Sequence, residues 1–338
     1  MARPEFKMKQ VTLLYGIDVM DGLKQLEDES VQMVCTSPPY WGLRSYGVDG
    51  QLGLEKTPEE FVSKLVEVFR EVKRVLRKDG TLWLNLGDSY VSAKSRYSST
   101  PQTLAGKVSH GEPVDNNRPD LKGHNILKDK DLCGIPWRVA FALQADGWFL
   151  RSDIIWSKPN PMPESVTDRC TKSHEYIFLL TKSARYFFDS EAIKEDSIWY
   201  EERPSGMERN GAQYRDKVKR KYYEQKNYGG GGTSFKNRSG NLKSDGTEIS
   251  GRFRNKRTVW EIATQPYPES HFATFPEEIP RLCILAGSKP GDLILDPFSG
   301  SGTTGEVAVK LGRRYVGIDL NSKYLELAKQ RIGLFAFV

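Results

Sequence analysis

The stretch 291–318 constrains the fold of this chain more than any other. Gly291–Asp296 has the apolar pattern of a buried strand, and glycines then turn the chain into a helical stretch that begins near Thr303 and ends at Gly312. A second strand candidate, Tyr315–Ile318, follows directly. The pattern predicts a strand, a glycine-rich turn and a helix, an arrangement that binds nucleoside cofactors at the turn.

The turn after the first strand reads D-P-F-S-G-S-G-T-T and suits two classes of cofactor. Gly300, Gly302 and Gly305 satisfy G-x-G-x-x-G, and Asp319 lies 14 residues further on, so one class is a nicotinamide or flavin dinucleotide. Asp296 favours the other class, because a carboxylate at the mouth of the loop repels a diphosphate but attracts a sulfonium and an ammonium. S-adenosyl-L-methionine has both cations and no phosphate, so it is the cofactor that we expect. A purely structural turn is the third interpretation.

A second motif, T-S-P-P-Y at residues 36–40, directly follows the apolar run Val31–Cys35, which is typical of a short buried strand. The two prolines form a stiff turn, since proline fixes its own φ and has no N–H to continue a ladder. We expect the Ser37 hydroxyl and the Pro38 carbonyl to accept one N–H each from an exocyclic amino group, with the Tyr40 ring as a stacking face for the base. The alternative is an ordinary Pro-Pro turn with an aromatic ring packed on it.

Together the two motifs resemble those of the amino-methyltransferases of DNA restriction-modification systems. Here the base-gripping motif precedes the cofactor loop, which is similar to the circularly permuted beta group of that family. The resemblance covers most of the chain outside two polar insertions. It implies an α/β, Rossmann-like, S-adenosylmethionine-dependent methyltransferase fold, with a seven-stranded, mostly parallel sheet that has one antiparallel strand. Serine at the first motif position resembles the cytosine-N4 enzymes, whereas adenine-N6 enzymes usually carry aspartate there.

The resemblance also implies roles for single residues. Asp18 and Phe298 contact the cofactor adenine, Asp319 holds the ribose hydroxyls, and Phe275 lies in the segment, Trp260 followed by His271–Pro276, that closes over the methionine portion. The predicted catalytic residues are Ser37, Pro38, Pro39 and Tyr40. The predicted cofactor-binding residues are Asp18, Thr36, Phe275, Asp296, Phe298, Ser299, Gly300, Gly302, Thr303, Thr304 and Asp319.

Basic charge is concentrated in one segment. The whole chain has a formal net charge of +6, but residues 203–257 contain fifteen Lys or Arg and five Asp or Glu, so the remainder carries −4. Tyrosines interleave with these cations, a composition that suits phosphate contact and base stacking. We predict that the segment reads DNA; a basic loop without a specific partner is the alternative. The predicted DNA-binding residues are Arg215, Lys217, Lys219, Arg220, Lys221, Arg252 and Arg254.

Other segments predict further elements. Helix-capping signals at residues 57–60, followed by apolar residues spaced three and four apart, predict an amphipathic helix packed on a sheet. By resemblance, Thr81–Asp88, Asp153–Pro163 and His174–Thr181 are later strands with their substrate-side loops. Cys35 precedes the proline turn, and the alternation of side chains along the strand Val31–Cys35 points it toward the core.

We expect one catalytic domain interrupted by an insert. Residues 1–195 form the half with T-S-P-P-Y and contain a polar insertion at 92–131, residues 196–258 form the basic target-recognition insert, and residues 259–338 complete the domain with the cofactor loop. The start lacks the apolar core of a secretion signal, and no run reaches eighteen apolar residues, so we expect a cytoplasmic protein with no membrane partner. The four cysteines form no C-x-x-C pair, and we expect no metal site.

The reaction that we infer is direct methyl transfer from S-adenosyl-L-methionine to N4 of a cytosine that has left the stack of double-stranded DNA. A restriction endonuclease that shares the target site is a candidate partner, and the chain is expected to act as a monomer or a homodimer. The nearest alternative is the same reaction on adenine N6. More distant ones are methylation of protein glutamine or RNA guanine, an NAD(P)-dependent dehydrogenase, and a non-catalytic DNA-binding protein.

Overall fold

The computed structural model of this chain describes residues 5–7, 10–42, 47–91, 124–196, 253–265 and 275–336. The chain divides into two compact units, one formed by Met1–Asp189 with Arg257–Val338 and the other by Ser190–Lys256. Most of the polar insertion and of the basic insert lies outside the described residues. Within the described ranges, no helix is long and apolar enough to cross a bilayer.

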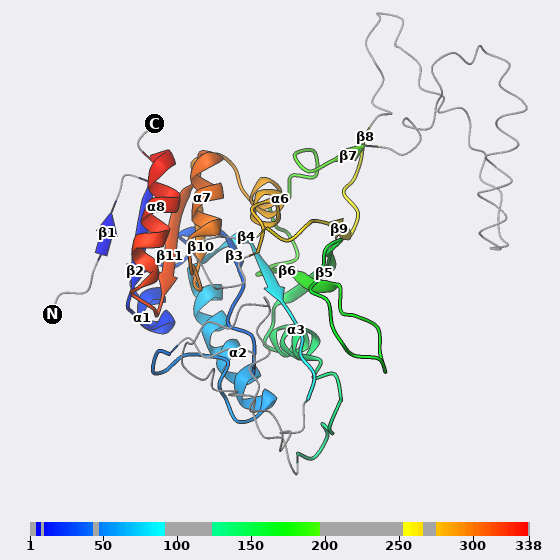
Figure 1. The fold of residues 1–338 in the computed structure, drawn as a ribbon. Coiled ribbons are helices and arrows are strands. Elements are labelled where there is room, and N and C mark those ends of the chain that lie inside the picture. The colour runs from blue at the N-terminus through cyan, green and yellow to red at the C-terminus, as the bar shows by residue number, and fades with distance from the viewer. Residues whose placement is uncertain are drawn as a thin grey trace, which may run out of the picture. The chain divides into compact units, whose positions relative to one another are not determined.

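The larger unit is built on one mixed sheet (Figure 1). Seven of its strands run parallel to one another, whereas β1 and β6 run antiparallel to their neighbours. The nine strands exceed the predicted seven, because β1 and β9, of three residues each, extend the two edges of the expected sheet. In spatial order the strands are β1 (Glu5–Lys7), β2 (Val11–Tyr15), β11 (Arg314–Asp319), β10 (Leu293–Asp296), β3 (Val31–Thr36), β4 (Leu76–Leu86), β6 (His174–Thr181), β5 (Phe149–Ser157) and β9 (Val259–Glu261).

Helices cover both faces of this sheet (Figure 1). One layer contains α1 (Val19–Leu23), α2 (Pro58–Val75) and α3 (Ile135–Ala145). The other layer contains α6 (Glu278–Gly287), α7 (Thr303–Lys310) and α8 (Tyr324–Ala336). Alternate residues of each central strand therefore face different helices. In β3, Val34 belongs to the core beneath α2. Its neighbour Met33 faces α6 instead, since its Cγ lies 3.0 Å from where a Cβ at Gly287 of α6 would be.

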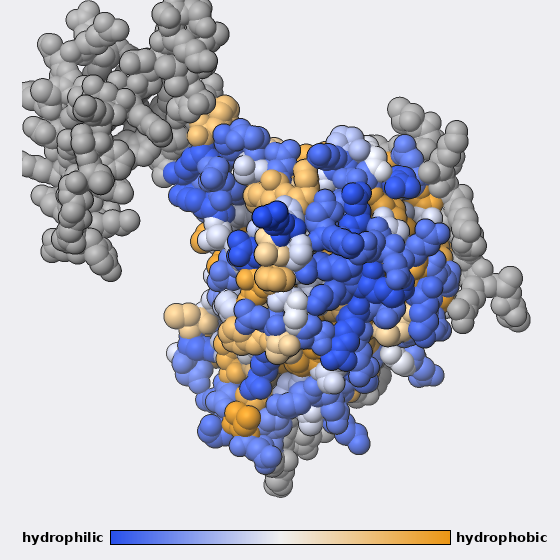
Figure 2. Space-filling model, turned by 180° about the vertical axis from the view of Figure 1, so that it is seen from behind, coloured by the Kyte–Doolittle hydropathy of each residue, from blue (hydrophilic) through white to orange (hydrophobic). Residues whose placement is uncertain are grey.

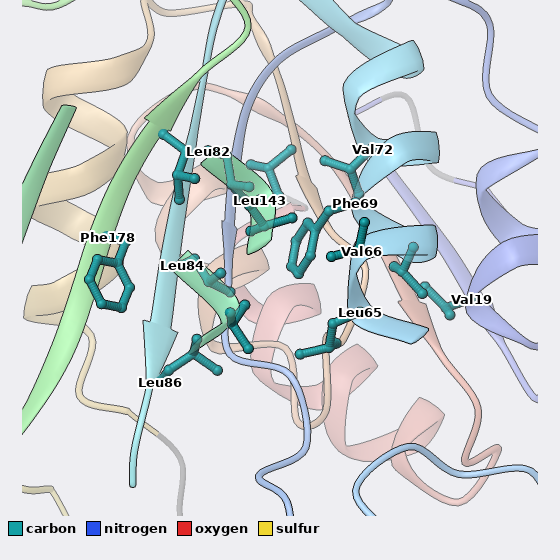
Figure 3. Close-up of a cluster of buried hydrophobic side chains, with 14 of the residues drawn as sticks. Val19, Leu65, Val66, Phe69, Val72, Leu82, Leu84, Leu86, Leu143 and Phe178 are labelled. Carbon is teal, nitrogen blue, oxygen red and sulfur yellow. The ribbon is translucent and has the colours of Figure 1, made fainter. Parts of the chain in front are cut away.

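The α2 helix forms as its sequence predicts. Thr57 is the N-cap and accepts a hydrogen bond from the Glu60 backbone N–H at 3.2 Å, and Pro58 occupies the first turn, where its missing N–H costs nothing. Figure 3 shows the apolar face of α2, which includes Leu65 and Phe69, packed on side chains of the sheet. Phe69 is fully buried there, and its truncation to alanine would cost roughly 3–5 kcal/mol.

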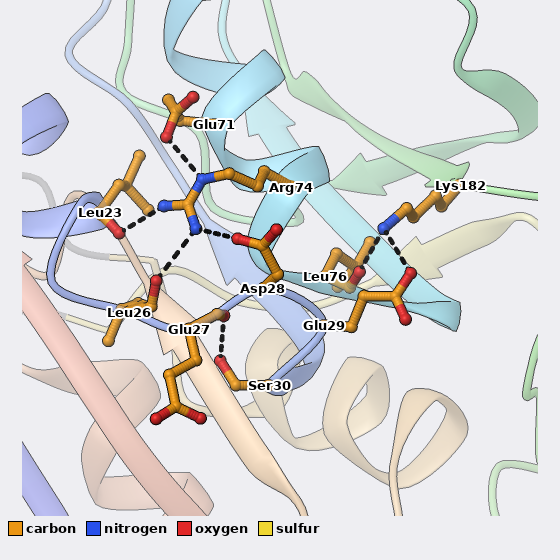
Figure 4. Close-up of polar contacts among 10 residues, drawn as sticks. All are labelled: Leu23, Leu26, Glu27, Asp28, Glu29, Ser30, Glu71, Arg74, Leu76 and Lys182. Carbon is orange, nitrogen blue, oxygen red and sulfur yellow. Dashed lines mark hydrogen bonds and ion pairs between the residues drawn. The ribbon is translucent and has the colours of Figure 1, made fainter.

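The Arg74 guanidinium fixes the connection that leads into β3 (Figure 4). It donates to the carbonyl oxygens of Leu23 and Leu26, at 2.9 and 3.0 Å, and also pairs with Asp28 and Glu71. A planar group with five N–H donors suits this set of acceptors on two segments. Arg74 therefore ties the end of α1 and the turn before β3 to α2, which holds the strand that carries T-S-P-P-Y.

The surface seen from the opposite side is largely hydrophilic, with hydrophobic residues in small separate patches (Figure 2). Scattered exposed apolar side chains are ordinary for a folded domain. In the smaller unit, the described residues form a short antiparallel pair of strands, β7 (Glu195–Asp196) and β8 (Phe253–Arg254).

The strand order creates a switch point between β3 and β10. The chain leaves β10 for β11 on one side, whereas it leaves β3 for β4 on the other. In open α/β sheets, ligands bind at the carboxyl ends of the strands where the order reverses in this way. The carboxyl ends of β3 and β10 carry the two motifs, so the fold places both at this switch point.

Candidate active site

The proline corner and the cofactor loop meet at the ends of two neighbouring strands. Strands β3 and β10 pair in parallel, with Met33 opposite Ile294 and Val34 opposite Leu295. At the end of this pair, the Thr36 hydroxyl donates a hydrogen bond of 2.6 Å to Asp296. Two segments 260 residues apart in sequence thus share one hydrogen bond at the base of the candidate site.

Asp296 is buried, with 2% of its surface exposed, and its carboxylate accepts three hydrogen bonds. Thr36 and the backbone N–H of Phe298 donate to Oδ1, and the Thr304 hydroxyl donates to Oδ2 at 2.8 Å. Desolvation nonetheless raises the pKa of Asp296 to about 6, because these bonds offset the burial of the charge only in part. Asp296 therefore fastens β3 and α7 to β10 while it keeps a negative charge close to the switch point.

Two buried tyrosines support the loop from below. The Tyr15 hydroxyl donates to the Ser299 hydroxyl at 2.7 Å and to the Gly300 carbonyl at 2.9 Å. Ser299 also shares a hydrogen bond of 2.7 Å with the Tyr315 hydroxyl. Its side chain is thus engaged by the protein itself, which leaves the backbone of the loop as the part that faces a ligand.

Asp319 lies at the end of β11, beside the same loop. Its carboxylate accepts the backbone N–H of Gly300 and that of Asn321, each at 2.8 Å. Burial raises the pKa of Asp319 to about 6, and the charge of Asp296 contributes to the increase, so the ends of β10 and β11 hold two carboxyls that are costly to ionise. A bound cation would relieve that cost, and the site is therefore electrostatically suited to a positively charged ligand.

Glycine occupies positions 300, 302 and 305 of the loop for different structural reasons. Gly302 is the N-cap of α7 with φ of 82°, a left-handed conformation that favours glycine. A Cβ at Gly305 would lie 2.5 Å from the Tyr315 ring, so this position serves the packing of α7 on the sheet. A Cβ at Gly300 would meet no described atom within 4 Å, which leaves its backbone open to close approach. The G-x-G-x-x-G spacing is thus satisfied without a diphosphate site.

At the proline corner, Tyr40 is anchored by its hydroxyl. It donates to a Glu175 carboxylate oxygen at 2.6 Å and lies 3.2 Å from the Asn85 side-chain oxygen, while the Ser37 hydroxyl lies 3.3 Å away. A Cβ at Gly87 would lie 2.5 Å from the Tyr40 ring, so glycine there gives the ring its place. Ser37 and Tyr40 are both partly buried, so they are held in position but remain accessible.

The structure also describes the remaining predicted cofactor residues. Thr303 is buried in the first turn of α7, and Phe275 and Phe298 are partly exposed. Asp18 is exposed and caps α1, where it accepts the Met20 backbone N–H at 2.8 Å. It follows β2, whose carboxyl end lies at the same edge of the sheet. The contacts of these residues with a cofactor stay predictions.

Most of the predicted DNA-binding residues lie outside the described residues: Arg215, Lys217, Lys219, Arg220, Lys221 and Arg252. Arg254 is described, and its guanidinium donates to the Glu195 carboxylate at 2.8 Å within the smaller unit. This pairing places Arg254 in the contact between β7 and β8. Its role toward DNA stays a prediction.

Sequence reasoning missed five residues that shape the site. Tyr15 and Tyr315 support the loop, Asn85 and Glu175 hold the Tyr40 hydroxyl, and Lys158 pairs with Glu175. The three polar ones had a signal, because each lies in or directly after a strand that the sequence predicted. The network that these three side chains form beside Tyr40 depends on which strands are neighbours, and the residue pattern does not contain that information.

The glycine loop with its buried carboxyls and the proline corner lie at the ends of two neighbouring strands, as expected for an enzyme that works on a DNA base. The sequence profile of the N6/N4 DNA methylase family matches residues 31–330, and this chain belongs to that family. The chain is 44% identical over 326 residues to the type II methyltransferase M.Cfr9I of Citrobacter freundii, a match that covers 96% of this chain and 89% of the relative. It is also 44% identical over 328 residues to M.SmaI of Serratia marcescens, covering 97% and 92% of the two chains.

Solved structures support the same fold. The cytosine-N4-specific PvuII DNA methyltransferase matches with a TM-score of 0.59 at 16% identity, covering 97% of this chain and 88% of that one. The TTHA0409 protein of Thermus thermophilus, solved in complex with S-adenosyl-L-methionine, matches with a TM-score of 0.54 at 22% identity, covering 97% and 95%. Family membership also decides against the dehydrogenase interpretation of the glycine loop.

Proposed function

We propose that this chain is a site-specific DNA methyltransferase that transfers a methyl group from S-adenosyl-L-methionine to N4 of a cytosine extruded from double-stranded DNA. The observation that carries the proposal is the hydrogen bond of 2.6 Å between Thr36 and Asp296, which joins the base-gripping motif to the cofactor loop. Such proximity allows a direct transfer, since the reacting groups need to lie within about 3.5 Å of each other.

The cofactor fits the residues that line the loop. Asp296 and Asp319 are carboxyls whose pKa burial raises to about 6, and a sulfonium or an ammonium would favour their ionised forms. When bound, the cofactor supplies a methyl group on a positively charged sulfur. Asp319 would hold the ribose, and Asp296 would balance the positive charge through the loop that it fastens. The family relationship and the complex of the TTHA0409 protein support this assignment.

The protein's own contribution is to orient the amino nitrogen. The Ser37 hydroxyl and the Pro38 carbonyl would each accept one N–H, which turns the nitrogen lone pair out of conjugation with the ring. Tyr40 would give the base a stacking face. The nitrogen lone pair attacks the methyl carbon, the C–S bond breaks with its electron pair retained on sulfur, and the nitrogen then loses a proton to water. Preorganisation of these acceptors supplies the rate enhancement, without a covalent enzyme intermediate.

The choice of cytosine N4 rests on the serine at position 37. The structurally similar PvuII methyltransferase is described as cytosine-N4-specific, which supports the same choice here. Adenine N6 is the second candidate, because Ser37 and Pro38 would accept the two N–H groups of either base equally well. We further propose that the basic insert contacts DNA phosphates and that a restriction endonuclease shares the target sequence.

Nucleoside analysis and single-molecule sequencing of DNA from cells that express this chain test the proposal. We expect N4-methylcytosine at one short recognition sequence, and its loss when Ser37→Ala replaces the wild type. The matched control is Ser30→Ala, because the Ser30 hydroxyl donates to the Glu27 carbonyl in the turn before β3. N6-methyladenine without N4-methylcytosine would refute the choice of base. Undiminished methylation by the Ser37 variant would refute the catalytic assignment.

A further inference from the structure

A chain of hydrogen bonds runs from the proline corner to the start of β6. The Ser37 hydroxyl lies 3.3 Å from the Tyr40 hydroxyl, and the Tyr40 hydroxyl lies 2.6 Å from Glu175 Oε2. These residues come from segments that the sheet brings together, and Glu175 lies at the amino end of the antiparallel strand β6. Because β6 runs against its neighbours, its first residues lie at the carboxyl ends of β4 and β5, on the same edge of the sheet as the two motifs.

The far end of this chain has a fixed polarity. The Lys158 ammonium pairs with Glu175 Oε1, and a carboxylate in such a pair only accepts hydrogen bonds. The Asn85 amide nitrogen donates to the Tyr176 carbonyl at 3.1 Å and to Glu175 Oε2 at 3.2 Å, which turns the amide oxygen toward Tyr40. Both of these neighbours of the Tyr40 hydroxyl are therefore acceptors.

This polarity propagates to Ser37. A tyrosine hydroxyl has one proton, and here it is donated toward Glu175 and Asn85, so its oxygen is left to accept the proton of the Ser37 hydroxyl. The lone pairs of the Ser37 oxygen are then left for an external donor. An exocyclic amino group offers such a donor, whereas a ring carbonyl at the same position would face oxygen lone pairs.

We propose that Glu175 is a positioning residue that makes Ser37 a hydrogen-bond acceptor, and that the active site thereby selects a base with an amino group over one with a carbonyl. The inference rests on the proposed function and adds a residue outside both sequence motifs. Glu175 acts through Tyr40 and does not touch the base itself.

The isosteric variant Glu175→Gln separates polarity from shape. Lys158 would hold the amide oxygen, so the amide nitrogen would turn toward Tyr40 and Asn85. Tyr40 would then accept from the variant's amide nitrogen, so its proton would be shared between the Asn85 oxygen and Ser37. When Tyr40 donates to Ser37, the Ser37 proton points at the incoming amino group. Two donors would face each other, so we expect kcat to fall roughly 10- to 100-fold, with the Kd for S-adenosyl-L-methionine unchanged.

A double-mutant cycle shows whether Glu175 acts through Tyr40. Glu175→Gln and Tyr40→Phe are measured singly and together, with Glu71→Gln as the matched control, because Glu71 pairs with Arg74 on the remote helix α2. In the Tyr40→Phe background, Glu175→Gln should reduce kcat no further, since the relay is already broken. If Glu175 served only to hold Lys158 and Asn85, the two effects on kcat would multiply, and this would overturn the proposal.

The preference of each enzyme for duplexes with cytosine over duplexes with uracil gives a second readout. Partial unfolding of the variant would weaken binding to both duplexes and leave this preference unchanged. The wild type and Glu175→Gln are compared on duplexes with cytosine or uracil at the target position, so that any mismatch effect cancels between the two enzymes. We expect the preference for cytosine to fall at least about 10-fold in the variant. An unchanged preference would overturn the inference. If Glu175→Gln does not fold, Tyr40→Phe is compared with the wild type in the same assay. We expect it to lose the preference for cytosine as well, and an unchanged preference would overturn the inference. A wild type that methylates no amino group would instead refute the proposed function.

Discussion

Replacing Asp296 by asparagine should stabilise the protein while it weakens cofactor binding. The amide has nearly the same shape as the carboxyl, and its oxygen can keep the hydrogen bonds from Thr36 and the Phe298 N–H. The amide nitrogen would then face Thr304, whose hydroxyl can turn to the Cys35 carbonyl, 3.4 Å away. Asparagine thus resembles the protonated form of the acid in an otherwise intact network.

The size of the stability change follows from the pKa of Asp296, which burial raises from its ordinary value of 3.8 to about 6. A raised pKa means that the folded protein binds the proton more tightly than the unfolded chain does. The stability from that proton is fully present below pH 3.8 and is lost as the pH rises through 6. At pH 8 the loss amounts to about 3 kcal/mol, at 1.36 kcal/mol per pKa unit. Asparagine has no such loss.

Cofactor binding should change in the opposite direction. The negative charge of Asp296 attracts the cations of S-adenosyl-L-methionine, and at an effective dielectric constant of about 20 this attraction is on the order of 2 kcal/mol. Its removal corresponds to an increase of about 30-fold in Kd. S-adenosylhomocysteine lacks the sulfonium, so its Kd should increase less.

Urea unfolding at pH 8 and pH 5, together with calorimetric titration of both ligands, tests this reasoning. Asp296→Asn should be more stable than the wild type by about 3 kcal/mol at pH 8, and by about half of that at pH 5. Thr36→Val provides the contrast, because it keeps the charge, removes one donor and should lose roughly 1–3 kcal/mol at both pH values. An Asp296→Asn protein that is less stable than the wild type at pH 8, or that binds the cofactor as tightly, would contradict the account.

Other changes have equally specific outcomes. Gly87→Ala should displace the Tyr40 ring, because the new Cβ would lie 2.5 Å from it, and kcat should fall at least about 10-fold while the cofactor Kd stays constant. Tyr15→Phe removes a donor from Ser299 and should increase the cofactor Kd by roughly 3- to 10-fold, a change that calorimetry would detect. Replacing the cations 219–221 by alanine should reduce the slope of log Kd against log salt by roughly 0.9 for each phosphate that these side chains neutralise; an unchanged slope would exclude them from DNA binding.

The α/β character of the fold and the positions of its main elements follow from local patterns. Capping signals and apolar spacing located α2, and the strand patterns located β3, β10 and β11 within one or two residues, whereas β6 was expected from the family resemblance. Cys35 is buried, as its alternation indicated. These features are predictable because periodicity and turn residues act over a few neighbouring positions. The two short edge strands were missed, since three residues carry too little pattern.

Assembly of the site, in contrast, depends on the folded sheet. Residue patterns alone establish the two motifs, the family that they resemble and the expectation that they act together. The pairing of β3 with β10, the hydrogen bond from Thr36 to Asp296, and the chain from Ser37 to Glu175 depend on strand order. Strand order is set by the packing of helices on both faces of the whole sheet. The pKa of Asp296 likewise depends on burial, which is a property of the assembled fold and of no single segment.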